Sequence, residues 1–467
     1  MLGREKDRVG RPRRITRRDF LKWSAAAGLT STLAGMGVLS ALGIVRGPQE
    51  PVPAWEVEPG VVDYDLVPEG LSGPTPNILK VAQWYDYWPG SFLVDFETHI
   101  RDTYGLEVNV QDHWDIYTSN EELFHWLTIN KRRYDLIFPS NYFVDLMKKT
   151  NMIYTLNDAW LPNLGAGFSN MMSGLVNVPA GNPYDRRNVN GEWQWVSVPY
   201  FWGTTGIGFR TDKLPVEEIK ELGWDVFWMD SYQPRAPGYE RVELRKKMRM
   251  LDDQRDVIGT GLKKAGWEWQ KAQGWIPTGR FPPDGPQWTT NDTEPEHVKP
   301  AGDLLFAAKP NLFDFNSTDQ STSLIGGSAV LNMAWSGDMM YAIQPNANVS
   351  YPVEYIIPRQ GSSWWVDCAA IHSKSRNLWL AHQFLNFIHD PKQNMALTKW
   401  NLYSTPNQLT FDALPPFPNG YNMKDDARLY PNIYAPEDFR ICDFAQDIGL
   451  DALLNLYNPL WFDLTTD

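Results

Sequence analysis

Two hydrophobic periodicities alternate along residues 78–139. Three short apolar runs, at residues 78–84, 108–110 and 134–139, have the composition of buried strands. Between them, residues 92–104 and 120–130 carry apolar side chains at helical spacing. The order strand, helix, strand, helix, strand predicts a parallel α/β sheet.

The loops after these strands are where we expect a ligand to bind. In open parallel sheets, ligands lie at the carboxyl ends of the strands, where loops and helix amino termini converge. Residues 84–89 and 140–142 follow two of the predicted strands. These two loops are therefore the first places in which to look for binding residues.

Two segments, residues 176–195 and 266–293, interrupt the regular alternation. The second is dense in Trp, Gly and Pro. Neither segment repeats, and neither is of low complexity. We expect both to be surface loops.

The amino-terminal segment has the features of an export signal. Thr16-Arg17-Arg18-Asp19-Phe20-Leu21-Lys22 resembles the twin-arginine signal, and an uncharged stretch follows at residues 23–45. We therefore expect the twin-arginine export machinery to deliver the protein to a periplasmic or other extracytoplasmic location. Ala41-Leu42-Gly43 is a weak cleavage site, so residues 1–46 are either a removed signal or a retained membrane anchor. Residues 47–75, rich in Pro, Gly and acidic side chains, are predicted to be a linker.

Charge is distributed unevenly along the chain. The first 46 residues hold ten Lys or Arg and three Asp or Glu, a balance of +7, so the formal charge of −13 leaves −20 for the remainder. An acidic body argues against nucleic acid as a partner, because phosphates require Lys and Arg. It suits a cationic ligand. With 43% hydrophobic and 21% charged residues, the 467 residues are enough for two globular domains.

The sequence lacks the common signatures of catalysis and of metal binding. It has no Gly-x-Ser-x-Gly elbow, no His-Glu-x-x-His and no phosphate-binding Gly loop. Its two cysteines, Cys368 and Cys442, are too few for a disulfide framework or a cysteine-rich metal site, and whether they pair stays open. We expect no metal, no cofactor and no enzymatic activity.

Seven short motifs are spread over residues 83–407. They are Gln83-Trp84-Tyr85-Asp86-Tyr87, Tyr134-Asp135-Leu136-Ile137-Phe138-Pro139-Ser140-Asn141-Tyr142-Phe143-Val144-Asp145-Leu146-Met147, Val198-Pro199-Tyr200-Phe201-Trp202-Gly203-Thr204-Thr205-Gly206-Ile207-Gly208, Leu251-Asp252-Asp253-Gln254-Arg255-Asp256, Met333-Ala334-Trp335-Ser336-Gly337, Trp364-Trp365-Val366-Asp367 and Tyr403-Ser404-Thr405-Pro406-Asn407. In content and order they resemble the spermidine/putrescine-binding protein family, the solute-binding components of polyamine ABC importers.

The resemblance implies an α/β, two-lobed periplasmic binding protein fold of type II-like topology, with the ligand in the cleft between the lobes. Lobe I would comprise residues 76–205 plus 367–410, and lobe II residues 206–366 plus 411–467. The implied partners are a small polyamine and the membrane permease of an ABC transporter.

The resemblance also implies a binding site made of acids and rings. The acids would pair with ammonium groups, and the rings would pack on the methylenes between them. The implied acids are Asp86, Asp253, Asp256 and Asp367. The implied rings are Trp84, Tyr87, Tyr142, Trp335, Trp365 and Tyr403, with Ser140 adding a hydroxyl.

Some positions depart from the family pattern. Bulky Tyr85 stands where relatives carry a small hydroxyl residue, so it should narrow one end of the cleft. Asp86 and Asp256 stand where a longer Glu can occur. The length of the ligand therefore stays open between a diamine such as putrescine and a spermidine-sized molecule.

Three alternatives remain at this point. The same fold binds other small ligands, such as a sugar, an amino-acid derivative or a ferric ion. Asp253 or Asp256 could serve only as a helix N-cap. A glycosidase with paired carboxylates is the alternative from another class, but two acids three residues apart on a helix would lie side by side, not on opposite sides of a bond.

Overall fold

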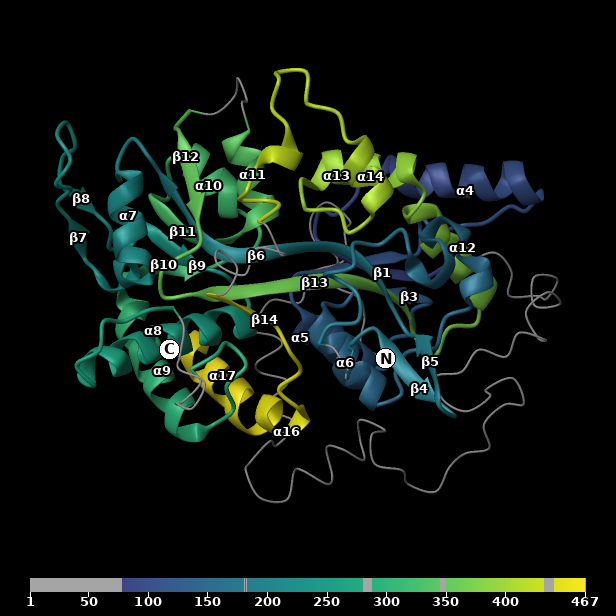
Figure 1. Ribbon diagram of the computed structural model, residues 1–467, viewed down its shortest axis with the longest axis horizontal. Coiled ribbons are helices and arrows are strands. Elements are labelled where there is room, and N and C mark those ends of the chain that lie inside the picture. Colours follow the sequence, from purple (N-terminus) through teal and green to yellow (C-terminus); the bar gives the residue numbers. More distant parts are fainter. Residues whose placement is uncertain are drawn as a thin grey trace, which may run out of the picture.

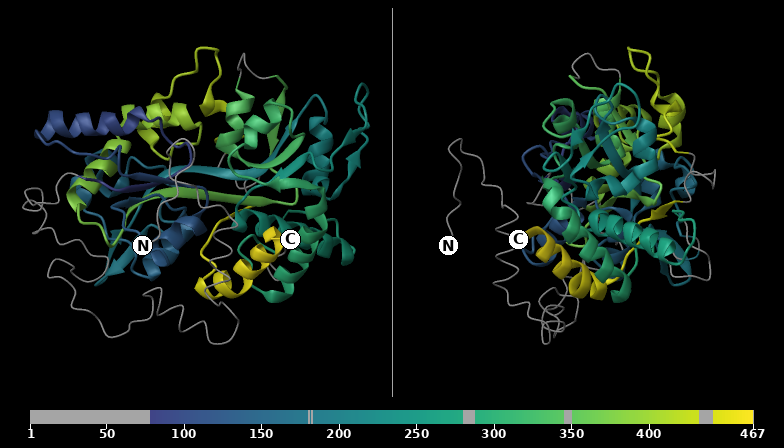
Figure 2. Two further views of the ribbon diagram at one scale, coloured as in Figure 1. Left: turned by 180° about the vertical axis from the view of Figure 1, so that it is seen from behind. Right: turned by 90° about the vertical axis from the view of Figure 1, so that its left-hand side faces the viewer.

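The computed structural model describes residues 78–179, 181, 183–279, 288–344, 350–431 and 441–466. Within these residues the chain forms one ten-stranded mixed sheet, covered by helices on both faces (Figures 1 and 2). The strands of this sheet are β1 (Val81–Trp84), β2 (Trp114–Tyr117), β3 (Leu136–Ile137), β6 (Val198–Arg210), β9 (Met248–Met250), β10 (Leu312–Phe315), β11 (Leu331–Trp335), β12 (Val353–Ile356), β13 (Ser362–Ile371) and β14 (Cys442–Phe444).

Two long strands, β6 and β13, run through both lobes of the molecule (Figure 1). Every residue of both strands is buried, and the two pair antiparallel with each other. The sheet order is β10-β9-β11-β6-β13-β3-β1-β2, with β12 paired to β6 and β14 to β13. The predicted two-lobed α/β architecture is therefore present, with β6 and β13 as the crossing strands.

The predicted lobe I contains the parallel strands β1, β2 and β3 and both predicted helices. Its helices are α4 (Ser91–Tyr104), α5 (Asn120–Thr128), α6 (Asn141–Lys149), α12 (Leu378–Ile388), α13 (Pro391–Asn401) and α14 (Gln408–Ala413). Helix α4 buries its apolar stripe and ends at Gly105, whose φ of 68° is a left-handed conformation that favours glycine. Helix α5 begins after Ser119, whose hydroxyl accepts the backbone N–H of Glu122. Both helices and two of the three strands confirm the predictions from periodicity.

The prediction of a strand at residues 108–110 is wrong. Asn109 makes only an isolated bridge with Ile78, and the strand that pairs with β1 is β2. Strand β2 lies at the edge of the sheet, where Asp115 and Ile116 are exposed. An edge strand that is open to solvent has no continuous apolar run to mark it.

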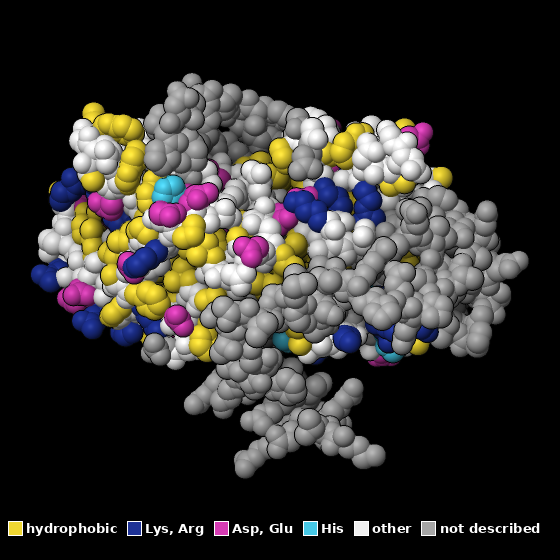
Figure 3. Space-filling model, turned by 90° about the horizontal axis from the view of Figure 1, so that it is seen from below, with side chains coloured by type: hydrophobic (Ala, Val, Ile, Leu, Met, Phe, Trp, Pro, Cys, Tyr) yellow, Lys and Arg dark blue, Asp and Glu magenta, His cyan; other side chains and the backbone are white. Residues whose placement is uncertain are grey.

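Lobe II holds β9 to β12 and a second set of helices. These are α7 (Val216–Leu222), α8 (Gln254–Ala272), α9 (Pro295–Ala308), α10 (Gln320–Ile325), α11 (Ser336–Ile343), α16 (Leu450–Ala452) and α17 (Asn458–Thr466). In Figure 1, α10 and α11 lie on one side of the sheet, and α8, α9 and α17 on the other. Seen from below, that second side carries apolar, acidic and basic side chains intermixed (Figure 3).

The buried side chains form two large clusters. One surrounds β1, β3 and the first half of β6, and the other surrounds β9, α8 and α9. Residues near the carboxyl terminus belong to both, because Leu453 packs in the first cluster and Leu464 in the second. The exact lobe boundaries stay a prediction.

The prediction of two surface loops is wrong for the first segment and partly wrong for the second. Residues 176–195 contain the hairpin of β4 (Arg186–Val189) and β5 (Glu192–Trp195), whose turn is Asn190-Gly191 with φ of 53° and 94°. In the second segment α8 continues to Ala272, and both Trp267 and Trp288 are buried. Residues 280–287 of that segment lie outside the described residues.

The predicted signal and linker, residues 1–46 and 47–75, also lie outside the described residues. Among the helices that the structure does describe, none combines the length and the apolar character that a membrane span requires.

Candidate ligand-binding site

A cavity of about 560 Å³ lies between the two lobes. All twelve side chains that the sequence singled out line it: Trp84, Tyr85, Asp86, Tyr87, Ser140, Tyr142, Asp253, Asp256, Trp335, Trp365, Asp367 and Tyr403. They come from strand ends, from the first turns of α6 and α8, from β13 and from the turn after α13. The fold thus brings together residues up to 319 positions apart in the sequence, from Trp84 to Tyr403.

Asp367 lies on crossing strand β13 and is almost fully buried. The hydroxyl of Ser140 donates to its Oδ1 at 2.6 Å, and the Tyr87 hydroxyl donates to its Oδ2. Burial raises the pKa of Asp367 to about 7, and the charge of Asp256 adds to the rise. Near neutral pH this carboxyl therefore holds a proton part of the time in the ligand-free cavity.

Asp253 and Asp256 lie at one end of the cavity. Asp253 is the N-cap of α8, and its carboxylate accepts the backbone N–H of Asp256 at 3.0 Å. Asp253 lines the cavity as well, so it is not only an N-cap. Asp256 accepts from the Ser363 hydroxyl at 2.6 Å and from Nε1 of Trp335 at 2.7 Å. Burial raises the pKa of both acids, and the nearby charge of Asp256 raises that of Asp253 further.

Arg255 also lines this end of the cavity. Glu121 does not line the cavity, but the charges of Arg255 and Asp256 act on it. The sequence analysis assigned no role to either residue. The guanidinium of Arg255 lies 4.8 Å from the centre of the Tyr142 ring and lines the cavity. Burial raises the pKa of Glu121 to about 7, while the charge of Arg255 acts to lower it. Arg255 was inside a recognised motif, so its side-chain type was visible but its direction was not.

The other end of the cavity is formed by Asp86 and Asp338. Asp86 has a φ of 56°, a left-handed conformation that Asp tolerates better than most residues. Burial raises its pKa. Asp338 lies in the first turn of α11 and accepts the Tyr403 hydroxyl, and burial, with Asp86 adding, raises its pKa to about 6.

Asp338 was missed by the sequence analysis, although it follows directly after a recognised motif. Its position depends on Gly337, because a Cβ at that residue would overlap the ring of Tyr403. Only glycine lets α11 approach this ring so closely. That packing could not be anticipated from the sequence.

The aromatic side chains form a continuous wall between the two acidic ends. Ring centroids are separated by 6.2 Å for Trp84 and Trp335, 6.4 Å for Trp335 and Trp365, 5.7 Å for Trp365 and Tyr403, and 5.2 Å for Tyr403 and Tyr87. The indole of Trp84 is fixed by its Nε1, which donates to the Phe138 carbonyl at 2.7 Å. The cavity therefore places carboxylates at its ends and flat apolar faces between them.

The two cysteines are free and buried, which settles their pairing in this structure. Cys442 pairs with Ser362 at one end of β13, whereas Cys368 lies six residues further along that strand. Six strand residues span about 20 Å, too far for a disulfide. Among the described residues no group of three or more His, Cys, Asp or Glu side chains has the geometry to hold a metal ion.

Comparison with known proteins identifies the family. The sequence model of the bacterial extracellular solute-binding proteins matches residues 105–418, about two thirds of the chain. The chain belongs to this family. A solute-binding protein is the ligand-capturing component of a transport system and not an enzyme. Residues 14–34 match the twin-arginine translocation signal, so this solute-binding protein is exported, as predicted.

Individual relatives share most of their length with this solute-binding protein. The spermidine/putrescine-binding periplasmic protein of Escherichia coli (strain K12) is 27% identical over 376 residues, 80% of this chain and 88% of that protein. The putrescine/cadaverine-binding protein of Pseudomonas aeruginosa is 26% identical, and the matched region covers 76% of this chain and 85% of that protein. The solved structure of the TpPotD lipoprotein of Treponema pallidum has the same fold, with a TM-score of 0.59 and 23% identity. The superposition covers 84% of this chain and 100% of that lipoprotein chain.

Proposed function

We propose that this solute-binding protein captures a polyamine, either putrescine or a spermidine-like molecule, in the interlobe cavity and delivers it to an ABC permease. The observation that carries the proposal is the charge of the cavity. Five carboxyl groups line it, those of Asp86, Asp253, Asp256, Asp338 and Asp367, against the cations Arg255 and Lys399. The names of the curated relatives point to the same class of ligand.

The electrostatics of the cavity support this assignment. Burial raises the pKa of each of the five carboxyl groups. A buried negative charge without a counter-charge is costly, and a ligand ammonium would remove that cost. A neutral sugar would leave it in place.

The aromatic wall suits the carbon chain of a polyamine. A desolvated cation over a Trp or Tyr face contributes about 2 kcal/mol, and each buried methylene about 0.8 kcal/mol. In this proposal the rings provide much of the affinity. The acids determine which molecules enter, because an ammonium without a partner could not be buried there.

We also propose that ligand binding closes the two lobes about β6 and β13, with lobe I formed by residues 76–205 plus 367–410 and lobe II by residues 206–366 plus 411–467. Trp84 lies in the first lobe and Trp335 in the second, and their rings are adjacent across the cleft. A ligand held between them would stabilise the closed state through its higher affinity for that state.

Isothermal titration calorimetry of the purified protein tests the function. Putrescine, cadaverine, spermidine, spermine and agmatine are titrated in parallel with glucose and maltose. We expect saturable binding of at least one polyamine, no heat from the sugars, and recovery of the polyamine unchanged by chromatography. Saturable binding of a sugar with none of any amine would refute the proposal, and a chemically altered ligand would indicate an enzyme.

A further inference from the structure

A row of hydroxyl side chains lines the lobe II wall of the cavity. Ser317, Thr318, Ser321 and Thr322 belong to the turn between β10 and α10 and to the first turn of α10. A hydroxyl accepts a hydrogen bond from an ammonium group without adding charge. This segment therefore complements the carboxylates at the ends of the cavity.

The segment is tied to the acidic end of the cavity by its own hydrogen bonds. The backbone N–H of Asn316 donates to the Met250 carbonyl at 2.8 Å, and the N–H of Asp252 donates to the Ser317 hydroxyl at 2.8 Å. The side-chain oxygen of Asn316 accepts the N–H of Thr318 at 2.8 Å, which fixes the turn. A shift of the turn would therefore move Ser317 and disturb the residue next to Asp253.

The same segment holds Trp335 through Gln320, which is almost fully buried. Its Oε1 accepts the backbone N–H of Trp335 at 2.7 Å, and its Nε2 donates to the Ser317 carbonyl at 3.0 Å. Its carbonyl accepts from Nδ2 of Asn332 at 2.7 Å. One amide side chain thus couples the hydroxyl row to a ring of the aromatic wall.

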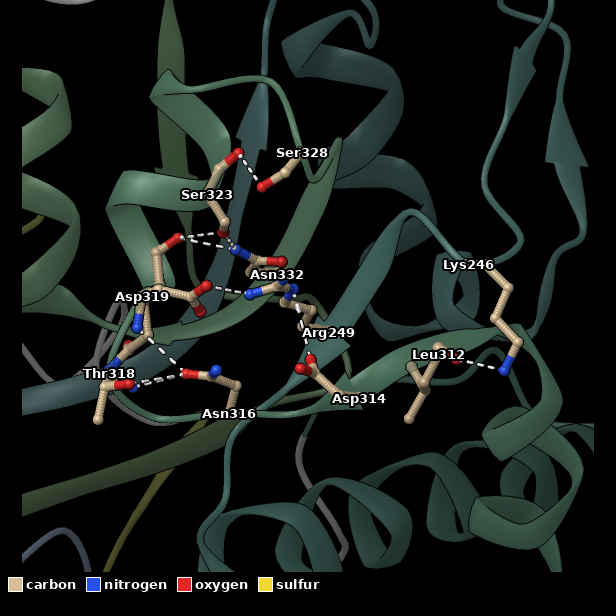
Figure 4. A network of polar contacts seen from close by, with 11 residues as sticks. Lys246, Arg249, Leu312, Asp314, Asn316, Thr318, Asp319, Ser323, Ser328 and Asn332 are labelled. Atoms are coloured by element: carbon tan, nitrogen blue, oxygen red, sulfur yellow. Dashed lines mark hydrogen bonds and ion pairs between the residues drawn. The ribbon is translucent and has the colours of Figure 1, made fainter. Parts of the chain in front are cut away.

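Arg249 interacts with the two ends of this segment through Asp314 and Asp319 (Figure 4). It lies in the middle of β9 between two fully buried methionines, and its side chain is 10% exposed. Its Nε is 3.4 Å from Oδ1 of Asp314, and its Nη1 donates to Asp319. Asp314 precedes the turn and Asp319 follows it, so one guanidinium fixes both ends of the turn.

We propose that Arg249 is a positioning residue for ligand binding. It is absent from the lining of the cavity and acts through Asp319 and Gln320 on the hydroxyl row and on Trp335. The inference rests on the proposed function, because it assigns the wall that Arg249 supports to a polyamine.

Arg210 provides a matched control. It lies in the same lobe, pairs with Asp212 at 2.9 and 2.7 Å, and lies over the Tyr351 ring at 3.4 Å. It does not line the cavity either. Arg210→Met therefore removes a comparable ion pair, whose partner Asp212 lies outside the hydroxyl row.

The test compares Arg249→Met, Arg249→Lys, Asp319→Asn and Arg210→Met by calorimetry with putrescine and spermidine, well below each variant's unfolding temperature. We expect Arg249→Met to weaken binding about tenfold, the usual scale for residues that support a site from outside it. Asp319→Asn, at a partly exposed position, should also weaken binding. Arg249→Lys should weaken binding less than Arg249→Met does, because it keeps the positive charge. Arg210→Met should leave affinity within about threefold of wild type. Equal effects of the two Arg→Met changes would overturn the proposal.

Hydrogen–deuterium exchange of the ligand-free proteins gives a second measurement that needs no ligand. Peptides covering residues 316–323 should exchange faster in Arg249→Met than in wild type and Arg210→Met. Unchanged exchange there would refute the positioning role. Faster local exchange in a protein that binds no polyamine would instead uphold the positioning role and reject the proposed ligand.

Discussion

Asp253 has two roles that the sequence presented as alternatives. Its carboxylate caps α8, and the same residue lines the cavity. Local motifs were sufficient to find such residues, because a short stretch of chain carries both the side chain and its backbone turn. Asp338 was beyond this kind of reasoning, since it reaches Tyr403 only through the packing allowed by Gly337.

Removing the charge of Asp338 should weaken binding of the ligand's nearer ammonium. We expect Asp338→Asn to lower putrescine affinity by about 2 kcal/mol, roughly thirtyfold, the scale of a hydrogen bond to a charged group. Glu296→Gln is the control, because Glu296 is also an acid in the first turn of a helix, α9, but does not line the cavity. Calorimetry that finds the two variants equal would exclude Asp338 from the site.

His389 should make the protein less stable in acid. Burial lowers its pKa to about 3, and the unfolded chain has the ordinary value near 6.5. As the pH falls below 6.5, His389 takes up a proton in the unfolded state but stays neutral in the folded state. The free energy of unfolding therefore decreases until the pH reaches the pKa of the folded state.

The test compares the pH dependence of urea unfolding between variants. From pH 6.5 to 5, His389→Gln should lose about 2 kcal/mol less of its unfolding free energy than wild type does. His99→Gln, at an exposed position of α4, should follow wild type. Parallel curves for wild type and His389→Gln would show that this histidine is not held neutral.

At the scale of elements, buried and periodic segments could be predicted and exposed ones could not. Helix α4 and strand β1 were visible because their apolar spacing reflects burial. Edge strand β2 has exposed side chains and gave no such pattern. The hairpin of β4 and β5 did carry a signal, the Asn190-Gly191 turn followed by the alternating residues 192–195, which the prediction of a surface loop overlooked.

The amino terminus of α11 docks against Tyr403 and brings Asp338 into the cavity. Gly337→Ala should move the helix terminus away from Tyr403, because the added methyl group would overlap the ring. Overpacking of this kind costs about 1–3 kcal/mol. We expect at least about tenfold weaker polyamine binding. Gly90→Ala is the control, since nothing lies within 4 Å of a Cβ at that position. Calorimetry showing wild-type affinity for Gly337→Ala would contradict this docking role.

At the scale of the molecule, two lobes share one sheet and enclose one acidic, ring-lined cavity. The two lobes were predicted from the family resemblance that the motifs and their order carry, and two of these motifs lie in the crossing strands β6 and β13. The length of the ligand was not predictable, since it depends on how far apart Asp338 and Arg255 lie in the cavity. These two side chains come from elements that meet only in the folded protein.

The central claim is that a ligand cation pairs with buried carboxyl groups of this cavity. The pKa values of about 7 for Asp367 and about 6 for Asp338 mean that protons occupy part of these groups at pH 6.5. An entering ammonium, with an ordinary amine pKa near 10.4, would stay charged and displace them. Affinity should therefore rise with pH from 5.5 until it levels near pH 8.

The most direct measurement is calorimetric titration with putrescine at pH 6.5 in two buffers that differ in ionisation enthalpy, such as phosphate and ACES. We expect saturable binding. The binding enthalpy should differ between the two buffers, because the buffer takes up protons that the protein releases on binding. Repeating the titration at pH 8.5, in two buffers of higher pKa, should reduce that difference, because Asp367 and Asp338 have by then lost their protons. Absence of binding, or binding with no proton release at pH 6.5, would contradict the account.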